Sequence, residues 1–302
     1  MNLKNEITQL KKEKNAVLLV HNYQKPEIQD IADELGDSLG LSRRAAKTNA
    51  EVIVFCGVKF MAETAKILSP QKTVLLPRPE LEVGCPMADM VTAPQLKKLK
   101  DEHPEAKVVS YVNTNADVKA ETDVCCTSSN AVEVVKNIDA EKIIFVPDKN
   151  LASYVKRFVT KEIIPWNGFC YVHERITKKE VLRAKEEYPE ALLIVHPECR
   201  PEVIDLADEV LSTGGMVRRA KESSRNKFLI GTEEGILYRL KKENPQKEFY
   251  TAGTPKMCAG MKRPTLQDVY LALKDELNPV EIPEAIMKRA RRSLEAMLNY
   301  TG

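Results

Sequence analysis

The sequence predicts an α/β protein made of three homologous αβα units with short parallel sheets. Two observations indicate this fold class. Short runs of Val, Ile and Leu alternate with segments of helical spacing, and this alternation is typical of βαβ units with a mostly parallel sheet. In addition, one pattern of spacings occurs three times along the 302 residues, and such self-similarity marks repeated structural units.

Each copy of the repeat begins with an apolar run that ends in a polar residue: His21, Tyr111 and His196. An aspartate follows 12 residues later in every copy: Asp33, Asp123 and Asp208. A hydroxyl residue follows 17 residues after the polar residue: Ser38, Ser128 and Thr213. Each copy ends near a cysteine: Cys85, Cys170 and Cys258. Coincident spacings in three places indicate three homologous units, each contributing one cysteine to a shared site.

The repeat divides the chain into a first unit at residues 1–86, a second at 87–171 and a third at 172–302, which also carries C-terminal helices. A unit of about 85 residues is near the small end for an independent core. We therefore expect the three units to pack against one another.

Composition excludes several classes of protein. Lys plus Arg number 46 and Asp plus Glu number 44, and no basic stripe or aromatic-rich platform indicates nucleic-acid binding. No signal peptide and no run of 18 apolar residues is present, so we expect a soluble, cytoplasmic protein that has no membrane segment. Seven cysteines, an odd number in a long intracellular chain, favour metal binding or free thiols over disulfides.

The first unit shows how the elements follow one another. The run at 17–20 is continuously apolar, as expected for a strand buried on both faces. Ser38 precedes the helical segment 39–49 and fits an N-cap. The remaining elements expected here are helices at 4–14, 26–36 and 60–68 and strands at 52–55 and 73–76.

The second and third units repeat this order. In the second we expect strands at 108–112, 142–146 and 162–164 and helices at 96–103, 118–121, 129–137 and 151–158. In the third we expect strands at 192–195, 227–230 and 248–250 and helices at 178–188, 202–208 and 236–243, with Ser212 and Thr213 at the start of a further helix. Two last helices, 265–277 and 283–298, are expected to pack the units together.

The strand-end and helix-start residues predict an anion-binding cavity. Ligands of open parallel sheets bind beyond the carboxyl ends of the strands, and a helix N-terminus attracts anions. If the units pack with pseudo-threefold symmetry, the helix starts near Ser38, Ser128 and Thr213 face one central cavity. That cavity suits carboxylates and a phosphate. The alternative is that these hydroxyl residues only cap helices.

The three repeated cysteines predict a metal site. Cys85, Cys170 and Cys258 occupy matching places, and three thiolates with no obvious fourth fit either a zinc site with an open position or a [4Fe–4S] cluster with one open iron. An open position can polarise substrate oxygens. The alternative for each cysteine alone is a small buried apolar residue. The cysteines without threefold correspondence are Cys56, which fits a core position, Cys125, Cys126 and Cys199.

A set of His, Tyr and Glu residues predicts proton transfer. Tyr23 and Glu198 each lie two residues past a strand-end histidine, and His173 lies three residues after Cys170. Such groups can move protons on carbon next to a carbonyl. The alternative is a hydrogen-bonded polar cluster that only orients loops.

Motifs spread over nearly the whole chain resemble those of one known family. They are His21-Asn-Tyr-Gln, Gly36-Asp-Ser38, Phe60-Met-Ala-Glu63, Cys85-Pro-Met-Ala, Tyr111-Val-Asn113, Cys126-Thr-Ser128, His196-Pro-Glu198, Ser212-Thr-Gly214 and Met257-Cys258. On these motifs the chain resembles the quinolinate synthase A family, whose members make quinolinate for NAD biosynthesis.

The resemblance implies a reaction, a cofactor and a set of site residues. The reaction is condensation of iminoaspartate with dihydroxyacetone phosphate, with loss of phosphate and water, in an enzyme that can make transient contact with the one supplying iminoaspartate. It implies three αβα domains around a pseudo-threefold axis and a [4Fe–4S] cluster with one open iron, held by Cys85, Cys170 and Cys258. The implied catalytic residues are Tyr23, His21, Tyr111, His196 and Glu198. The implied substrate-binding residues are His21, Ser38, Tyr111, Val112, Asn113, Ser128, His173, His196, Pro197, Glu198, Ser212 and Thr213.

Two other classes fit part of the pattern. A non-catalytic anion-binding or metal-sensing protein would need the helix-start residues but neither Tyr23 nor Glu198. A zinc enzyme would use the same three thiolates for a different metal.

Overall fold

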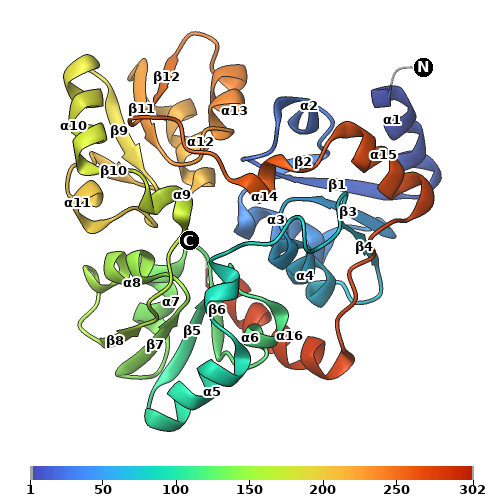
Figure 1. Cartoon of the computed structure of the whole chain (residues 1–302), viewed down its shortest axis with the longest axis horizontal. Helices are drawn as coiled ribbons and strands as arrows, with labels where there is room; N and C mark the ends of the chain where they lie inside the picture. The colour runs from blue at the N-terminus through green and yellow to red at the C-terminus, as the bar shows by residue number, and fades with distance from the viewer. Residues whose placement is uncertain (1–2, 301–302) are drawn as a thin grey trace.

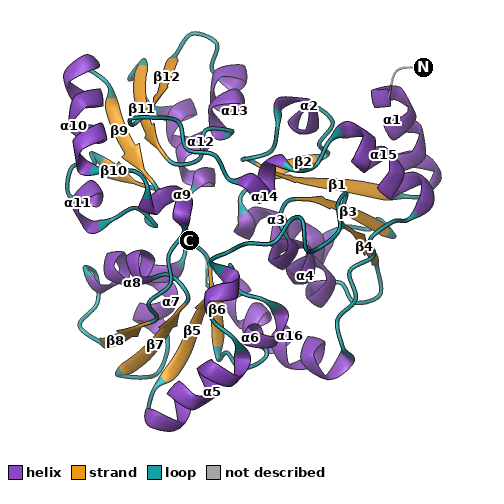
Figure 2. Cartoon of the chain, viewed as in Figure 1, coloured by secondary structure: helices purple, strands orange, loops and turns teal. Residues whose placement is uncertain are grey.

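The computed structural model describes residues 3–300 and contains three four-stranded sheets, each with all its strands parallel. The predicted α/β class with three αβα units is therefore confirmed. Figure 1 shows three lobes around a common centre, and Figure 2 shows that helices cover the strands of each lobe. No helix of residues 3–300 has the length and apolar character needed to cross a membrane.

The elements of the first lobe follow the predicted alternation. In chain order they are α1 (Leu3–Glu13), β1 (Ala16–His21), α2 (Pro26–Gln29), β2 (Glu34–Gly36), α3 (Ser38–Lys47), β3 (Val52–Cys56), α4 (Lys59–Leu68) and β4 (Thr73–Leu75). Strand order in the sheet is β2-β1-β3-β4.

The second lobe has the same strand order, β6-β5-β7-β8. Its elements are η1 (Ala88–Met90), α5 (Ala93–Glu102), β5 (Lys107–Tyr111), α6 (Ala116–Lys119), β6 (Val124–Cys126), α7 (Ala131–Asn137), β7 (Lys142–Val146), α8 (Lys149–Lys156) and β8 (Glu162–Pro165).

The third lobe, with strand order β10-β9-β11-β12, completes the repeat. Its elements are α9 (Tyr171–Glu174), α10 (Lys178–Glu187), β9 (Leu192–Val195), α11 (Pro201–Ile204), β10 (Glu209–Val210), α12 (Thr213–Glu222), β11 (Lys227–Gly231), α13 (Ile236–Glu243), β12 (Glu248–Thr251) and α14 (Ala259–Lys262).

The last two helices return to the other lobes. Helix α15 (Leu266–Asp275) packs on α1 and β3, and α16 (Glu284–Leu298) packs on α4, α6 and β6. Helix α16 thereby joins the first lobe to the second, as expected for a helix that packs the units together. The proposed unit boundary at 86/87 lies in the segment between the first and second sheets, and the one at 171/172 falls within α9.

The repeated aspartate fastens the first strand of each unit. In each sheet its carboxylate accepts a hydrogen bond of 2.8 Å from a strand N–H: Asp33 from Leu18, Asp123 from Val108 and Asp208 from Leu193. The aspartate N–H donates back to the carbonyl of the same strand residue at 3.0–3.1 Å. The 12-residue spacing is therefore a structural clamp, away from the strand ends that face the centre.

The expectation of a helix over 26–36 is wrong beyond Gln29. Helix α2 ends at that residue, and residues 34–36 form the edge strand β2. The same correction applies to 202–208, where α11 ends at Ile204 and β10 follows. Strand β6 was not predicted either. These edge strands are only two or three residues long, so they carry too few residues for a period to show.

The predicted cap of α3 needs a correction. Asp37, not Ser38, is the N-cap, and its carboxylate accepts from the Gly40 N–H at 2.9 Å. Ser38 is the first residue of the helix. For α12 the prediction was right, because the Ser212 hydroxyl accepts from the Gly215 N–H at 3.2 Å. Ser128 lies in the turn before α7, whose N-cap is Asn130.

The aspartate clamp predicts a stability effect. The Asp208→Ala variant leaves the Leu193 N–H without its charged acceptor, which should lower the free energy of unfolding by about 1.5–3 kcal/mol. Urea unfolding of the purified variant measures the change. The control is Glu186→Ala, since Glu186 is exposed on α10 and should change stability by less than about 0.5 kcal/mol. Equal stability of the two variants would contradict the clamp.

Candidate active site

One cavity at the centre of the three lobes gathers most of the predicted site residues. It encloses about 70 Å³. Its lining includes the predicted residues His21, Tyr23, Ser38, Tyr111, Asn113, Ser128, His173, His196, Glu198, Thr213, Cys85, Cys170 and Cys258. Three predicted substrate-binding residues do not line it: Val112, Pro197 and Ser212.

Strand register explains why distant residues meet here. His21 and Tyr111 are the last residues of β1 and β5, and His196 directly follows β9. The residue before each pairs with the neighbouring strand at the same level: Val20 with Cys56, Ser110 with Val146, and Val195 with Gly231. Each unit therefore presents one polar side chain at the carboxyl end of an equivalent strand.

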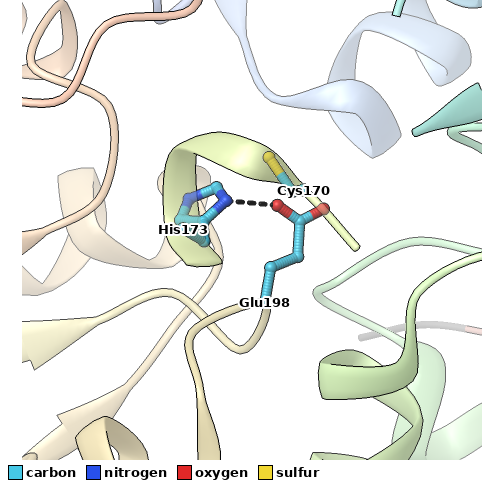
Figure 3. A group of neighbouring side chains, drawn as sticks. All are labelled: Cys170, His173 and Glu198. Atoms are coloured by element: carbon cyan, nitrogen blue, oxygen red, sulfur yellow. Dashed lines mark ion pairs between the residues drawn. The ribbon is translucent and has the colours of Figure 1, made fainter. Parts of the chain in front are cut away.

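A chain of close polar contacts links Tyr23 to Glu198. The Tyr23 hydroxyl lies 2.6 Å from Thr232 Oγ1, which lies 2.8 Å from His173 Nε2. On the other side of the ring, His173 Nδ1 lies 2.5 Å from Glu198 Oε2, a close ion pair that is not aligned as a hydrogen bond. Figure 3 shows His173 and Glu198 facing each other beside Cys170. All four polar groups of this relay are buried.

Glu198 is a buried carboxylate with several polar neighbours. Its Oε2 lies 3.5 Å from His196 Nδ1, and its Oε1 accepts from Asn113 Nδ2 at 3.5 Å. Burial favours a higher pKa of Glu198, but the neighbouring His173 and His196 outweigh this and lower its pKa. Glu198 therefore carries a charge in the centre of the protein.

Four other titratable groups of the cavity have pKa shifts that favour their uncharged forms at neutral pH. Burial lowers the pKa of His21 to about 4 and that of His196 to about 3. Burial raises the pKa of Tyr23 and of Tyr111 well above the usual value, and the nearby Glu198 carboxylate adds to both rises. A tyrosine here gives up its proton only to a partner held in place, such as the Thr232–His173 pair.

The helix starts of the first and third lobes meet at the cavity. The Thr213 hydroxyl, at the start of α12, accepts from Asn22 Nδ2 at 3.0 Å. Asp37 lies opposite, and its Oδ2 lies 3.3 Å from the Ser212 hydroxyl. A Cβ at position 214 would lie 2.4 Å from Asp37 Oδ2, so only glycine allows this close approach.

The seven cysteines fall into two groups. Cys85, Cys170 and Cys258 are partly exposed and line the cavity. The remaining four are buried outside the cavity lining: Cys56, Cys125, Cys126 and Cys199. All seven are free thiols. Burial raises the pKa of the Cys85 thiol to about 12 and also raises the pKa of Cys170 and Cys258, so metal binding has to release their protons.

The spacing of the three sulfurs bears on which metal they fit. Among residues 3–300, the only group of His, Cys, Asp or Glu ligand atoms within 4.8 Å of one another is that of Cys170, His173 and Glu198, which could hold a metal ion. At least one pair of the three cysteine sulfurs is therefore more than 4.8 Å apart, compared with roughly 3.8 Å between ligands of a tetrahedral zinc with Zn–S bonds of about 2.3 Å. A multi-iron cluster spans a larger distance between its ligands than a single zinc ion does.

Sequence reasoning missed two residues of this centre. Thr232 follows β11, and its equivalents by register are Gly57 and Pro147, so the repeat gives no signal for it. Asp37 was passed over in favour of the adjacent Ser38. Its signal was available, because an aspartate before a helix is a strong N-cap.

The sequence matches a known family over nearly its full length. The family described as Quinolinate synthetase A protein (NadA) matches residues 5–299. The chain is 55% identical over 294 residues to the quinolinate synthase of Thermodesulfovibrio yellowstonii, covering 97% of this chain and 96% of that protein. It is 54% identical to the quinolinate synthase of Alkaliphilus metalliredigens, with 98% of each chain covered. It is also 54% identical to the quinolinate synthase of Methanoregula boonei, with 98% of this chain and 97% of that protein covered.

The neutral buried histidines predict loss of stability in acid. A histidine with a folded-state pKa below its unfolded value of about 6.5 stabilises the fold fully above pH 6.5, and this stability is lost as the pH falls towards the folded pKa. With a folded pKa of about 4, His21 should account for a loss of about 2 kcal/mol between pH 7 and pH 5. Urea unfolding of the metal-free His21→Asn variant should therefore show about 2 kcal/mol less acid dependence than the parent. An unchanged dependence would show that the fold does not lower the pKa of His21.

Proposed function

Because the chain belongs to the Quinolinate synthetase A protein family, we propose that it is a quinolinate synthase of NAD biosynthesis. In this proposal it condenses iminoaspartate (iminosuccinate) with dihydroxyacetone phosphate. The products are quinolinate, inorganic phosphate and two molecules of water. Both substrates are small and anionic, and they meet in the central cavity.

The reaction balances without an added oxidant or reductant. One C–C bond forms between the carbon next to the imine and the three-carbon substrate as the C–O bond to phosphate breaks. One C–N bond forms when the substrate nitrogen attacks a carbonyl carbon. The carbonyl oxygen then leaves as water. A second hydroxyl leaves as water, and loss of protons from carbon gives the aromatic ring. The protein must therefore move several protons within a site sheltered from solvent.

The observation that carries the proposal is the buried relay from Tyr23 to Glu198. Tyr23 lines the cavity and acts on the substrate by giving or taking a proton at its hydroxyl oxygen. Thr232 Oγ1 passes the matching proton to or from His173 Nε2, which lies 2.8 Å away. The Glu198 carboxylate, 2.5 Å from Nδ1, stabilises the charge that develops on His173. A non-catalytic anion-binding protein would have no use for this arrangement.

Polar groups around the relay suit the substrates. Two carboxylates and a phosphate need donors, which Ser38 and Thr213 supply at helix starts together with Ser128 beside Tyr111. Asn113 adds an acceptor, because its buried Oδ1 has no hydrogen-bond partner among residues 3–300. An amino or imino N–H of the substrate is a suitable partner for this oxygen.

The residues of the cavity also fit the cofactor of the proposal. Cys85, Cys170 and Cys258 would hold a [4Fe–4S] cluster with one open iron. Such a cluster supplies Lewis acidity, which assists loss of water from a bound substrate. At least one pair of these sulfurs is more than 4.8 Å apart, which supports this assignment over a single zinc ion.

The proposed cofactor and substrates indicate where the enzyme works. A cluster with an open iron and seven free thiols suits the reducing cytoplasm, so we place the enzyme there. We also propose a transient contact with the enzyme that supplies iminoaspartate. No nucleic-acid or membrane partner enters the proposal.

The first test of the function separates the cysteines. Cys170→Ser should lose the full complement of iron and the formation of quinolinate, because one of three ligands is removed. The matched control Cys199→Ala should keep about four irons per chain, as expected for a [4Fe–4S] cluster. Iron and sulfide content with the visible spectrum, on anaerobically reconstituted protein, measures this. An intact four-iron spectrum in Cys170→Ser would show that the ligand assignment is wrong.

The second test addresses the relay. Glu198→Gln keeps the size of the side chain but removes its charge, so quinolinate formation should fall by about 100-fold or more while the cluster is retained. The control is Glu202→Gln, because Glu202 lies outside the cavity lining. Anaerobic turnover with both substrates measures the rates. Near-normal turnover of Glu198→Gln would remove Glu198 from the mechanism.

A further inference from the structure

The three units carry different residue types at one equivalent position beside the cysteine loops. By strand register, Cys56, Val146 and Gly231 are equivalent. The residue two positions further on is therefore equivalent as well: Val58, Asp148 and Glu233. All three are buried, with at most 2% of the residue surface exposed. Two units thus bury a carboxyl group where the first buries a valine.

The backbone around this position is the same in every unit. The N–H of the following residue donates at 2.9 Å to the carbonyl two residues before the repeated cysteine: Lys59 to Val83, Lys149 to Gly168, and Glu234 to Lys256. Each cysteine loop is therefore fastened to its own sheet by one shared main-chain hydrogen bond. This contact is common to the threefold scaffold and does not distinguish the loops.

The carboxyl groups add a second bond in two of the three loops. Asp148 Oδ2 accepts the main-chain N–H of Cys170 at 3.1 Å. Glu233 Oε1 accepts the main-chain N–H of Cys258, also at 3.1 Å. Val58 has no polar side-chain atom and cannot do the same for Cys85. Neither carboxyl group lines the cavity, so neither faces the substrates.

Both carboxyl groups are themselves held in place. Asp148 Oδ1 accepts from the Leu151 N–H at 2.7 Å, which caps α8. Glu233 Oε2 accepts from the Gly235 N–H at 2.7 Å, and Glu233 forms a 3.0 Å ion pair with Lys262, the last residue of α14. A buried acceptor with several fixed donors does not rotate, so its hydrogen bond holds the loop in one position.

The packing around Glu233 also reaches the relay. Lys262 Nζ donates to the main-chain carbonyl of Tyr23 at 2.5 Å. A Cβ on Gly235 would lie 2.4 Å from Lys262 Nζ and 2.6 Å from that carbonyl, so only glycine leaves room for this contact. The Glu233–Lys262 pair therefore ties the Cys258 loop to the backbone of Tyr23.

We propose that Asp148 and Glu233 are positioning residues that fix Cys170 and Cys258 in ligand geometry before metal binds. Cys85 lies in the one loop of the three that no such carboxyl group holds, and it adjusts last. Two of the three ligand thiols are thus held in position before metal binds, and the third can move. The main-chain hydrogen bond to the cysteine loop is the same in all three units. The consequence for a cluster rests on the proposed function, whereas the two hydrogen bonds do not.

Hydrogen exchange of the metal-free protein tests the positioning directly. In Asp148→Val, which copies the first unit, the amide of Cys170 should exchange at least about tenfold faster while that of Cys258 is unchanged. In Glu233→Val the pattern should be reversed. Asp148→Asn and Glu233→Gln keep one acceptor oxygen, so they should give smaller increases and cover the case in which a valine variant does not fold.

Iron release tests the consequence for the cluster. From anaerobic, reconstituted protein, an iron(II) chelator should remove iron several-fold faster from Asp148→Asn and Glu233→Gln than from the parent. The matched control Glu202→Gln should release iron at the parent rate.

The outcomes separate the two proposals. Equal exchange of both cysteine amides in every variant, or a rise in both loops together, would overturn the positioning roles. An iron-release rate equal to that of the parent, despite faster exchange, would overturn their effect on the metal. Failure of the parent to make quinolinate would overturn the proposed function and leave the exchange result standing.

Discussion

The structure depends on keeping one negative charge, that of the buried Glu198, where three lobes meet. A buried carboxylate is costly unless neighbouring groups compensate it. Here His173 and His196 come from the third unit, as Glu198 does, and Asn113 comes from the second. Packing of the second lobe against the third therefore adds one donor to this charge. A misplaced second lobe would remove the Asn113 contact.

The two ends of each sheet differ in function: one stabilises the unit and the other faces the cavity. At one end the repeated aspartate returns to the first strand and closes the unit, as Asp208 does on Leu193. At the other end the strands stop together and their next residues enter the cavity. The aspartate spacing is the same in each unit, and these aspartates lie outside the cavity lining. The residues at the carboxyl ends serve chemistry, and there His21 and Tyr111 differ although their backbones are equivalent.

Much of the fold could be predicted from the sequence because buried parallel strands leave long apolar runs. Strand β1 and strand β9 were found in this way, within one or two residues of their ends. The edge strands β2 and β10 were missed because so few residues give no period. The cavity residues were found through the repeat and the family resemblance, whereas Thr232 was missed since its contacts to Tyr23 and His173 span 209 and 59 residues of sequence. Such contacts depend on tertiary packing, which no local pattern encodes.

The three equivalent sheets and the asymmetric centre are compatible because the backbone and the side chains are subject to different constraints. The sheets require only that apolar residues fill equivalent positions, and the main-chain bond to each cysteine loop needs no particular side chain. Substrates of unlike shape require different groups at equivalent points. The third unit supplies His196 and Glu198 to the cavity lining, and Thr232 and Glu233 to the layer behind it. An assembly of three identical units could repeat each of these groups but could not place a single relay, because every group would then occur three times.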